Sequence, residues 1–529
     1  MDRFGRAGGP FRARGPFIPP ARTARHGRRA AARQPRPARR AGLTWINAPA
    51  VRTAMMDAMN ATIAAQRPQA LASRPSDELL GRFDLLGPRY TSYPTADRMV
   101  EAFGRDELQG WIERRGLGGA TGPIALYAHL PFCESVCYYC ACNKVITRRH
   151  GQAAQYAAYL GREAALWRER LGARLPVSQL HLGGGSPTFF DDAELAALVA
   201  VLDEHFDLSG ARERSIEIDP RTVDAQRLAA LRAMGFDRVS FGVQDFDPDV
   251  QRAVHRVQPA EQVFDLVAAA RALAFGSINV DLIYGLPRQS RESFARTIEQ
   301  VCELRPDRIA LYAYAHLPER FKPQRRIDAA ALPAAADKIA MLSIAIERLL
   351  AAGYDYVGMD HFALPGDALA AARRSGTLHR NFQGYTTQHD GDLVALGVSG
   401  IGKTGPTYHQ NAKTLPEYYD LLDRGLLPVV RGVELTRDDL LRRAVIMALM
   451  CQGRVEFESI ESAFLVRFAE YFAPELERLG EFEQMGLVSR SDDGIEVTPT
   501  GWFFVRAVAM VFDRYLRARG ASGGFSRIL

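Results

Sequence analysis

Cysteine is scarce in this sequence, with six among 529 residues. A small secreted domain held together by disulfide bonds has a far higher proportion, so the count favours a reducing compartment. Two of the six, Cys302 and Cys451, stand alone in helix-like sequence, where a cysteine usually serves as a small buried apolar residue. The other four lie within ten residues, at positions 133, 137, 140 and 142. This stretch is the first candidate for chemistry.

Long apolar runs are also absent. No uninterrupted stretch approaches the roughly 20 residues that a membrane-spanning helix needs, so we expect no membrane span. Hydrophobic residues make up 47% of the chain and charged residues 24%, which is ordinary for a globular protein. A chain of this length buries a large core and typically folds as two or more domains.

Lysine and acidic residues are nearly absent from the N-terminus. Residues 1–56 contain thirteen Arg, no Lys and one acidic residue, Asp2, for a net charge of +12. Subtracting this from the total of +6 leaves −6 for residues 57–529. Residues 1–75 lack apolar periodicity, so we expect them to be disordered. A transit peptide, a nucleic-acid-binding tail and a start assigned too far upstream all fit, and the composition favours the last, with the true start at Met55, Met56 or Met59.

From residue 123, short apolar runs alternate with longer amphipathic stretches. The expected strands are 123–130, 177–182, 214–218, 237–243, 277–283 and 308–315. The expected helices are 152–172, 191–206, 222–234, 260–273 and 290–304. This alternation is typical of βαβ units and a parallel sheet. The turn Gly183-Gly184-Gly185 does not match the dinucleotide-binding fingerprint, so we predict an α/β fold built on a partial (β/α)6 barrel.

Polar residues gather where these strands end. In chain order they are the cysteines, the Gly183 turn, Glu217 with Asp219, Gln244 with Asp245, Asp281, and Tyr314 with Ala315 and His316. The carboxyl ends of the strands in a parallel α/β barrel share one face, and that face holds the active site. The six ends therefore predict one site.

Beyond residue 316 the alternation ends. Residues 334–352 predict a helix, Tyr354 to Phe362 a further strand, and the run Leu378 to Thr387 is too polar for core. From Thr436, a helical stretch, a hairpin with its turn at Asp493-Gly494 and a final helix resemble a winged-helix module. A lid over the barrel mouth suits the acidic body better than DNA binding does. The predicted segments are a leader (1–75), a tether (76–122), the partial barrel (123–330), an extension of the barrel that covers substrate (331–435) and a mainly helical, winged-helix-like C-terminal domain (436–529).

The spacing Cys-x3-Cys-x2-Cys of Cys133, Cys137 and Cys140 suits an inorganic cluster. A four-iron cluster takes four ligands, so three thiolates leave one iron open to another molecule. A zinc site usually draws a second ligand pair from a distant segment, and no such Cys/His pair is evident. A disulfide knot suits a small secreted domain. The pattern therefore favours an iron–sulfur cluster.

This motif after a first strand is the signature of the radical S-adenosylmethionine (SAM) enzymes. From about Arg82 to the C-terminus the chain resembles the oxygen-independent coproporphyrinogen III oxidases. The motifs that carry the resemblance are Tyr127-x-His129-x3-Cys133, Cys142-Asn143-Lys144, His181-Leu182-Gly183-Gly184-Gly185, Ile216-Glu217-Ile218-Asp219-Pro220-Arg221, Gly242-Val243-Gln244-Asp245, Asp281-Leu282-Ile283-Tyr284-Gly285-Leu286-Pro287 and the run His379 to Thr387. Two departures are mild, Ser186 where Thr is frequent and Ala141 where Gly is frequent.

The resemblance implies one 4Fe-4S cluster held by Cys133, Cys137 and Cys140, and two molecules of SAM. It implies contacts to the first SAM at Tyr127, Gly184, Glu217 and Ile401. It implies contacts to the second SAM at Tyr139, Gly185, Ser186, Gln244, Arg256, Asp281 and Ala315. No side chain is assigned a catalytic role, because the cofactors supply the hard chemistry. The glycine run is expected to let the cofactor approach the backbone closely.

The implied reaction is the oxidative decarboxylation of two propionates of coproporphyrinogen III, giving protoporphyrinogen IX for haem biosynthesis without oxygen. It implies an electron donor of the flavodoxin or ferredoxin type and an electron acceptor that the sequence does not identify. Arg89, Arg380 and Lys144 are candidate anchors for the substrate carboxylates. We expect no nucleic acid partner, a monomer and a cytoplasmic location. The alternatives are a haem chaperone of related sequence, which typically lacks the fourth cysteine and the His379 run, and a radical SAM methyltransferase.

Overall fold

The computed structural model describes residues 75–83, 85–117, 122–519 and 525, which all belong to one compact unit, Pro49–Leu529. The leader predicted over residues 1–75 lies outside the described residues except for its last one. Helix α2 (Asp77–Arg82) begins where the sequence predicts order to begin. Its N-cap is Ser76, whose side chain accepts a hydrogen bond from the Leu79 N–H. Among the described residues, no helix is long and apolar enough to cross a bilayer.

Six parallel strands form the centre of the fold, as the sequence predicts. They are β1 (Ile124–Leu130), β4 (Val177–Gly184), β5 (Glu213–Ile218), β6 (Arg238–Gln244), β7 (Ser277–Tyr284) and β8 (Arg308–Ala313). Each pairs in parallel with the next. In β1, the alternate residues Ile124, Leu126 and Ala128 are fully buried, which gives the strand one wholly apolar face.

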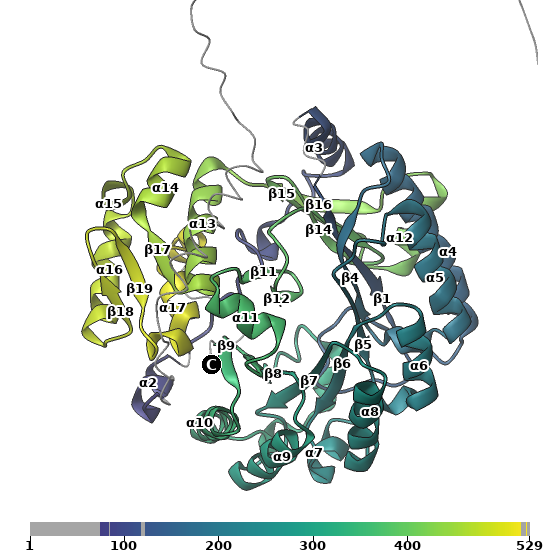
Figure 1. Cartoon of the computed structure of the whole chain (residues 1–529), viewed down its shortest axis with the longest axis horizontal. Helices are drawn as coiled ribbons and strands as arrows, with labels where there is room; N and C mark the ends of the chain where they lie inside the picture. The colour runs from purple at the N-terminus through teal and green to yellow at the C-terminus, as the bar shows by residue number, and fades with distance from the viewer. Residues whose placement is uncertain (1–74, 84, 118–121, 520–524, 526–529) are drawn as a thin grey trace, which may run out of the picture. The chain divides into compact units, whose positions relative to one another are not determined.

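Helices cover the outer face of these strands (Figure 1). They are α4 (Gly151–Leu171), α5 (Asp192–His205), α6 (Ala225–Ala233), α8 (Ala260–Ala272) and α9 (Arg291–Leu304), all close to the predicted bounds. Asp191 and Ser290 start α5 and α9 with capping boxes. The short helix α7 (Pro248–Ala253) was not predicted. Because the helices take the apolar face, the opposite face of the strands is left for polar side chains and a site.

The sheet extends beyond the six strands in both directions and contains twelve strands. On the β1 side lie β13 (Leu393–Leu396), parallel to β1, and then the antiparallel strands β14 (Ile401–Thr404), β15 (Thr407–Asn411) and β16 (Val429–Glu434). On the β8 side lie β10 (His361–Ala363) and β9 (Asp355–Gly358). The single strand predicted from Tyr354 to Phe362 is therefore wrong. Gly358 and Met359 have positive φ angles and turn the chain into a hairpin.

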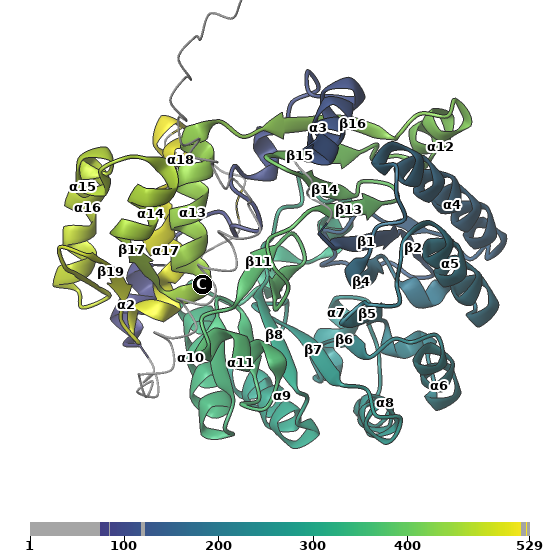
Figure 2. The ribbon, with the colours of Figure 1, turned by 45° about the horizontal axis from the view of Figure 1, so that its top comes forward.

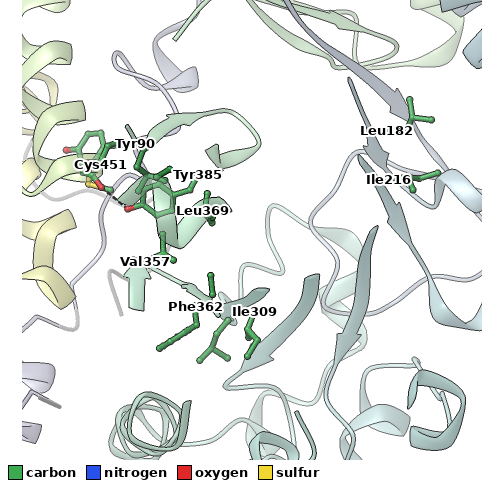
Figure 3. Close-up of a cluster of buried hydrophobic side chains, with 14 of the residues drawn as sticks. Tyr90, Leu182, Ile216, Ile309, Val357, Phe362, Leu369, Tyr385 and Cys451 are labelled. Atoms are coloured by element: carbon green, nitrogen blue, oxygen red, sulfur yellow. Dashed lines mark hydrogen bonds between the residues drawn. The ribbon is translucent and has the colours of Figure 1, made fainter. Parts of the chain in front are cut away.

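The run predicted to cover substrate forms a separate hairpin, β11 (His379–Asn381) and β12 (Gly384–Thr386). Its Tyr385 is buried, and the Tyr385 hydroxyl donates to the Met450 carbonyl (2.8 Å). Figure 3 shows Tyr385 between Cys451 on one side and Leu369 on the other. The lone Cys451 is buried here, in agreement with the apolar role predicted for it. The hairpin therefore joins the strands to the C-terminal helices.

The C-terminal module follows the order helix, strand, helices, hairpin, which is the winged-helix order. Its elements are α13 (Arg437–Gln452), β17 (Arg454–Glu456), α14 (Phe457–Phe464), α15 (Phe468–Tyr471), α16 (Ala473–Gln484), β18 (Val488–Arg490), β19 (Gly494–Val497), α17 (Val505–Met510) and α18 (Arg514–Arg519). These helices gather beside β11 (Figure 2), and α13 contacts that strand.

The remaining elements are α3 (Arg105–Leu117), β2 (Phe132–Cys133), β3 (Val145–Ile146), α10 (Ala335–Ala351), α11 (Ala368–Arg374), α12 (Leu415–Asp423) and the 3₁₀ helices η1 (Ala96–Arg98), η2 (Pro187–Phe189), η3 (Pro220–Thr222), η4 (Lys322–Arg326), η5 (Ala329–Ala331) and η6 (Gly501–Phe504). The predicted segment boundaries and the lid role stay predictions.

Candidate active site

The segment that carries the four clustered cysteines, residues 133–142, is called the cysteine loop here. It is fixed to the carboxyl ends of β1 and β4. Its first residues form β2, which pairs in parallel with β3. The Gly185 N–H donates to the Leu130 carbonyl and the Ser186 N–H donates to the Phe132 carbonyl, both at 2.8 Å. Two residues predicted to contact SAM, Gly185 and Ser186, are thereby held against the base of the loop.

The three predicted cluster ligands lie close enough to influence one another. Burial, and then the neighbouring Cys140 and Cys137 thiols, raise the pKa of Cys133 to about 12. The pKa of Cys140 is instead lowered to about 6 by a hydrogen bond with the Cys142 thiol and, against the effect of burial, by the Lys144 ammonium. Among the described residues no group of three His, Cys, Asp or Glu is drawn together as for a single metal ion. A four-iron cluster asks only that each thiolate reach its own iron.

Two arginines donate to the middle cysteine. The Cys137 sulfur accepts from Arg256 Nη1 at 3.4 Å and from Arg221 Nη2 at 3.6 Å. Both guanidinium groups also bind the carboxylate of Asp219, which caps η3. Hydrogen bonds to ligand sulfurs tune an iron–sulfur cluster, and positive charge favours the thiolates it needs. The residues present therefore fit a 4Fe-4S cluster.

Arg256 also connects the loop to the end of β6. Arg256 is buried, and its Nη2 donates to the Gly242 carbonyl at 2.5 Å. A Cβ on Gly242 would lie 2.9 Å from Gln244 Nε2 and 3.0 Å from Arg256 Nη2, so these two predicted site residues meet across the glycine. Gln244 has a φ of +70°, an uncommon value for a residue with a side chain, and it ends the strand.

Glu217 lies on the inner face of the barrel with Gly184, His181 and Tyr127. Its carboxylate accepts from the Gly184 N–H (2.9 Å) and is 3.4 Å from His181 Nε2, and the His181 ring stacks on Tyr127. Burial raises the pKa of Glu217, but the hydrogen bonds and charge of His181 and the Gly184 N–H outweigh it, and the pKa lies below its usual range. Glu217 is therefore an anionic acceptor suited to hydroxyl or ammonium donors.

Asp281 faces the same interior from β7. Its oxygens accept from Ser240 Oγ (3.1 Å) and Asn279 Nδ2 (2.9 Å). Burial, and then the charge of Glu217, raise the pKa of Asp281 to about 6. The structure thus brings the two predicted carboxylates, Glu217 and Asp281, within electrostatic reach of each other.

The glycine run has a physical reason within the protein itself, beside the cofactor approach predicted from the sequence. A Cβ on Gly184 would lie 2.6 Å from the His129 ring, and one on Gly185 would lie 2.6 Å from Pro131 backbone atoms. A Cβ on Gly183 would lie 2.9 Å from both the His181 and Glu217 side chains. Close packing of the protein itself therefore requires these glycines, whatever they allow a cofactor to do.

Tyr139 and Ala315 are connected by a residue that the sequence analysis missed. Gln324, in η4, is buried and donates from Nε2 to the Tyr139 carbonyl (3.1 Å) and the Ala315 carbonyl (3.2 Å). It lies in a basic, aperiodic stretch, so no sequence signal marks it. Ile401 starts β14 and packs instead with an apolar cluster that includes Phe382 and Met99.

Two of the three predicted carboxylate anchors lie together, and the third does not. Arg380 Nε donates to the Arg89 carbonyl (3.1 Å), and Arg89 pairs with Asp360. Lys144 lies elsewhere, because its Nζ donates to the Cys140 carbonyl (3.0 Å) and the Cys142 carbonyl (3.3 Å) of the cysteine loop. Lys144 therefore stabilises the cysteine loop through these two hydrogen bonds.

The pair Arg89 and Arg380 lies next to the strands of the barrel, because Arg89 contacts Tyr312 on β8. The Arg89 guanidinium lies over the Tyr312 ring, 5.0 Å from its centre. Tyr312 occupies β8 beside Ile283, two residues beyond Asp281 on β7. Burial, and then the charge of Asp281, raise the pKa of Tyr312. Tyr312 therefore lies between Arg89 and the strand that carries Asp281.

The radical SAM superfamily model matches residues 127–301, and the HemN C-terminal domain model matches residues 435–504. The oxygen-independent coproporphyrinogen III oxidase of Pseudomonas aeruginosa is 48% identical over 458 residues, which cover 85% of this chain and 98% of that protein. The chain belongs to the oxygen-independent coproporphyrinogen III oxidase family.

Two Escherichia coli comparisons agree with this membership. The oxygen-independent coproporphyrinogen III oxidase of E. coli is 46% identical over 451 residues, covering 85% of this chain and 98% of that protein. The solved structure of coproporphyrinogen III oxidase (HemN) from E. coli, described as a radical SAM enzyme, matches with a TM-score of 0.79 and 44% identity, covering 84% of this chain and all of that one.

Membership in the coproporphyrinogen III oxidase family confirms the predicted fold class and the prediction of a radical SAM enzyme. It implies a 4Fe-4S cluster and SAM as cofactors. The cluster ligands and the individual SAM contacts stay predictions.

Proposed function

We propose that this chain converts coproporphyrinogen III to protoporphyrinogen IX without oxygen, using one 4Fe-4S cluster and two molecules of SAM. The observation that supports it best is the shared inner edge that carries the cysteine loop, Glu217 and Asp281, in a chain that spans 98% of the P. aeruginosa oxidase. In each half-reaction a propionate loses a β-hydrogen atom, carbon dioxide and one electron and becomes a vinyl group. When bound, the cluster and SAM supply the 5′-deoxyadenosyl radical that takes the hydrogen atom.

The chain's own residues bind and orient these groups. Cys133, Cys137 and Cys140 would hold the cluster, with Arg256 and Arg221 donating to the Cys137 sulfur. Around them, the predicted first-SAM residues are Tyr127, Gly184, Glu217 and Ile401. The predicted second-SAM residues are Tyr139, Gly185, Ser186, Gln244, Arg256, Asp281 and Ala315. A carboxylate that stays ionised, as Glu217 does, would accept from ribose hydroxyls or from the amino group of SAM.

Arg89 and Arg380 would anchor a substrate carboxylate. Arg380 is buried and its Nη1 has no hydrogen-bond partner among the described residues, which is costly for a charged group. Arg506 lies nearby, and burial and then the charge of Arg89 lower its pKa to about 9. The only acidic residue that contacts Arg89 among the described residues is Asp360. This local excess of positive charge suits a substrate with four carboxylates, which guanidinium groups bind in pairs of hydrogen bonds.

The remaining parts of the proposal concern partners. An electron donor of the flavodoxin or ferredoxin type would reduce the cluster, and a separate acceptor would take the electron released at decarboxylation. We further propose that the protein works as a monomer in the cytoplasm, where thiols stay reduced.

An anaerobic assay of the reconstituted protein with SAM, dithionite and coproporphyrinogen III tests the function. We expect protoporphyrinogen IX with two carbon dioxide, two methionine and two 5′-deoxyadenosine per substrate. Stable haem binding with SAM cleavage and no decarboxylation would favour a chaperone. A methylated product would favour a methyltransferase.

The Asp281→Ala variant tests the site within that assay. We expect the iron and sulfide content to match the wild type while vinyl formation is lost. Asp265→Ala, at an exposed position on the outer helix α8, is the control and should behave as the wild type. Full activity in Asp281→Ala would remove this residue from the site.

A further inference from the structure

On the outer side of the cysteine loop, exposed and half-buried side chains from three parts of the chain contact one another. The Glu134 carboxylate pairs with His150 Nε2 at 3.2 Å. One residue later, Ser135 Oγ lies 3.5 Å from His255 Nδ1, which also bonds the Val136 carbonyl at 2.9 Å. These contacts join the start of α4 to the loop and the loop to the turn after α7.

Tyr138 continues this surface to η4. Its ring stacks on the His255 ring at 5.1 Å, and the Arg326 guanidinium lies 5.4 Å from its centre. The Tyr138 N–H donates to the Val254 carbonyl, which fixes the loop backbone beside α7. Tyr138 directly follows the predicted cluster ligand Cys137, so a molecule on this surface comes within one side chain of the cluster's sulfur.

Five exposed cations lie on the two segments that border this patch, the residues before α4 and η4. We call them the basic rim: Arg148, Arg149, Lys322, Arg325 and Arg326. Among the described residues, no carboxylate lies within ion-pair distance of any of them. Of the other charges near these segments, Glu134 pairs with His150 and Arg252 pairs with Asp249. Two further carboxylates, Glu319 before η4 and Asp328 at the start of η5, are fewer than the five rim cations. The rim therefore adds unbalanced positive charge to a chain whose residues 57–529 are net acidic.

An exposed apolar residue follows His255 in the turn after α7. Val257 is 60% exposed, one of the few large hydrophobic side chains so exposed among the described residues, and Ile146 on β3 is 44% exposed. Val257 is two residues after His255, and it adjoins Arg256, which bonds Cys137. An exposed apolar centre within a charged, polar rim is the anatomy of a transient protein interface.

We propose that this surface, the basic rim around Tyr138 and Val257, is the docking site for an acidic protein that donates one electron to the cluster, of the flavodoxin or ferredoxin class. The inference rests on the proposed function, since only a reducible cluster needs a donor. The donor is oxidised by one electron and the cluster is reduced by one electron, with no bond made or broken between the proteins. Opposite charges steer such encounters, and steering raises association rates by roughly 10- to 1,000-fold at low salt.

The test follows cluster reduction anaerobically in the reconstituted holoenzyme, with flavodoxin hydroquinone and with dithionite as alternative reductants. The Arg149→Glu/Arg326→Glu variant reverses two rim charges. We expect its reduction by flavodoxin hydroquinone to be about tenfold or more slower at low salt, with the deficit shrinking as salt rises. Reduction by dithionite, iron content and dithionite-driven turnover should match the wild type.

The control reverses two exposed arginines away from the loop, Arg114→Glu on α3 and Arg212→Glu before β5. Equal slowing in this control, or no slowing in the rim variant, would overturn the proposal, as would failure of flavodoxin hydroquinone to reduce the wild type. If the rim variant does not hold a cluster, Lys322→Glu/Arg325→Glu, which leaves Tyr138 untouched, decides by the same measurements. Loss of dithionite-driven turnover in the wild type would instead count against the proposed function.

Discussion

The two sides of the cysteine loop use arginine in opposite ways. On the inner side, Arg221 and Arg256 share the carboxylate of Asp219 and donate to Cys137. On the outer side, the basic rim is exposed and has no carboxylate partner among the described residues. A buried guanidinium holds a geometry and is costly to remove, whereas an exposed one contributes little stability and acts through its long-range field. Burial, and not residue type, therefore distinguishes the arginines that position the cysteine loop from the arginines that would attract a partner protein.

Replacement of the cysteines is expected to have the largest effect, and it should distinguish the three predicted cluster ligands from Cys142. Replacing Cys133, Cys137 or Cys140 by Ser should abolish the cluster, because each thiolate is expected to hold one iron. Cys142 is exposed, and Cys142→Ser should keep the cluster, since a fourth protein thiolate would take the iron that SAM needs. Iron and sulfide content and the cluster's visible absorption measure this. Equal loss in the Cys142 variant would contradict the three-ligand arrangement.

A matched pair of arginines near α7 gives the next effect. Arg256→Ala removes one of the two guanidinium partners of Asp219, leaves Arg221, and also removes the hydrogen bonds to the Gly242 carbonyl and the Cys137 sulfur. Because Arg256 is buried, these losses together should destabilise the protein by about 3–5 kcal/mol. Arg252→Ala removes an exposed pair with Asp249 and should cost about 0–1 kcal/mol. Anaerobic urea unfolding of the two variants measures the difference. Similar losses in both would show that burial does not separate the two sides of the loop.

Sequence alone predicts the part of the fold that repeats. Each of the six βα units has its own apolar pattern, and a parallel barrel converts the six strand ends into one edge, so Glu217 and Asp281 could be placed together from their positions alone. The antiparallel strands β14 to β16 carry no such pattern. The hairpin at Gly358 depends on a positive φ angle that an apolar run conceals.

The parts of the site that were missed depend on contacts between distant segments. Gln324 reaches Tyr139 across 185 residues, and nothing in its neighbourhood marks it. Arg89 and Arg380 were predicted with Lys144 from charge alone, and charge could not tell that Lys144 binds the loop carbonyls. Site residues that belong to one short motif can be predicted from sequence, whereas site residues that distant segments bring together by packing cannot.

A buried acid on α4 supports the strands beside the cysteine loop. Glu163, on α4, is fully buried and accepts from the Tyr418 hydroxyl, the Gly397 N–H and Asn411 Nδ2, each at 2.7 Å. In the same region, the Tyr156 hydroxyl donates to the His129 carbonyl at 2.8 Å and accepts from the Val398 N–H. Glu163 thus helps to fix the chain after β13, and Tyr156 links that segment to β1, which the cysteine loop follows.

The ionisation of Glu163 is expected to give the smallest effect. It tests the framework beside the cysteine loop and does not involve the predicted cofactor-binding residues. Burial outweighs the three hydrogen bonds and raises the pKa of Glu163 from 4.5 to about 7. The unfolded chain therefore loses this proton near pH 4.5 while the folded protein keeps it, so the contribution to stability is full below pH 4.5 and falls as the pH rises to 7. At one pKa unit per 1.36 kcal/mol, the loss is about 3 kcal/mol. Other buried acids titrate in this window, so the wild type is compared with Glu163→Gln, whose side chain cannot ionise. We expect the difference in unfolding free energy between the two proteins to change by this amount between pH 4.5 and 7, and parallel curves would mean that Glu163 is ionised in the folded protein throughout.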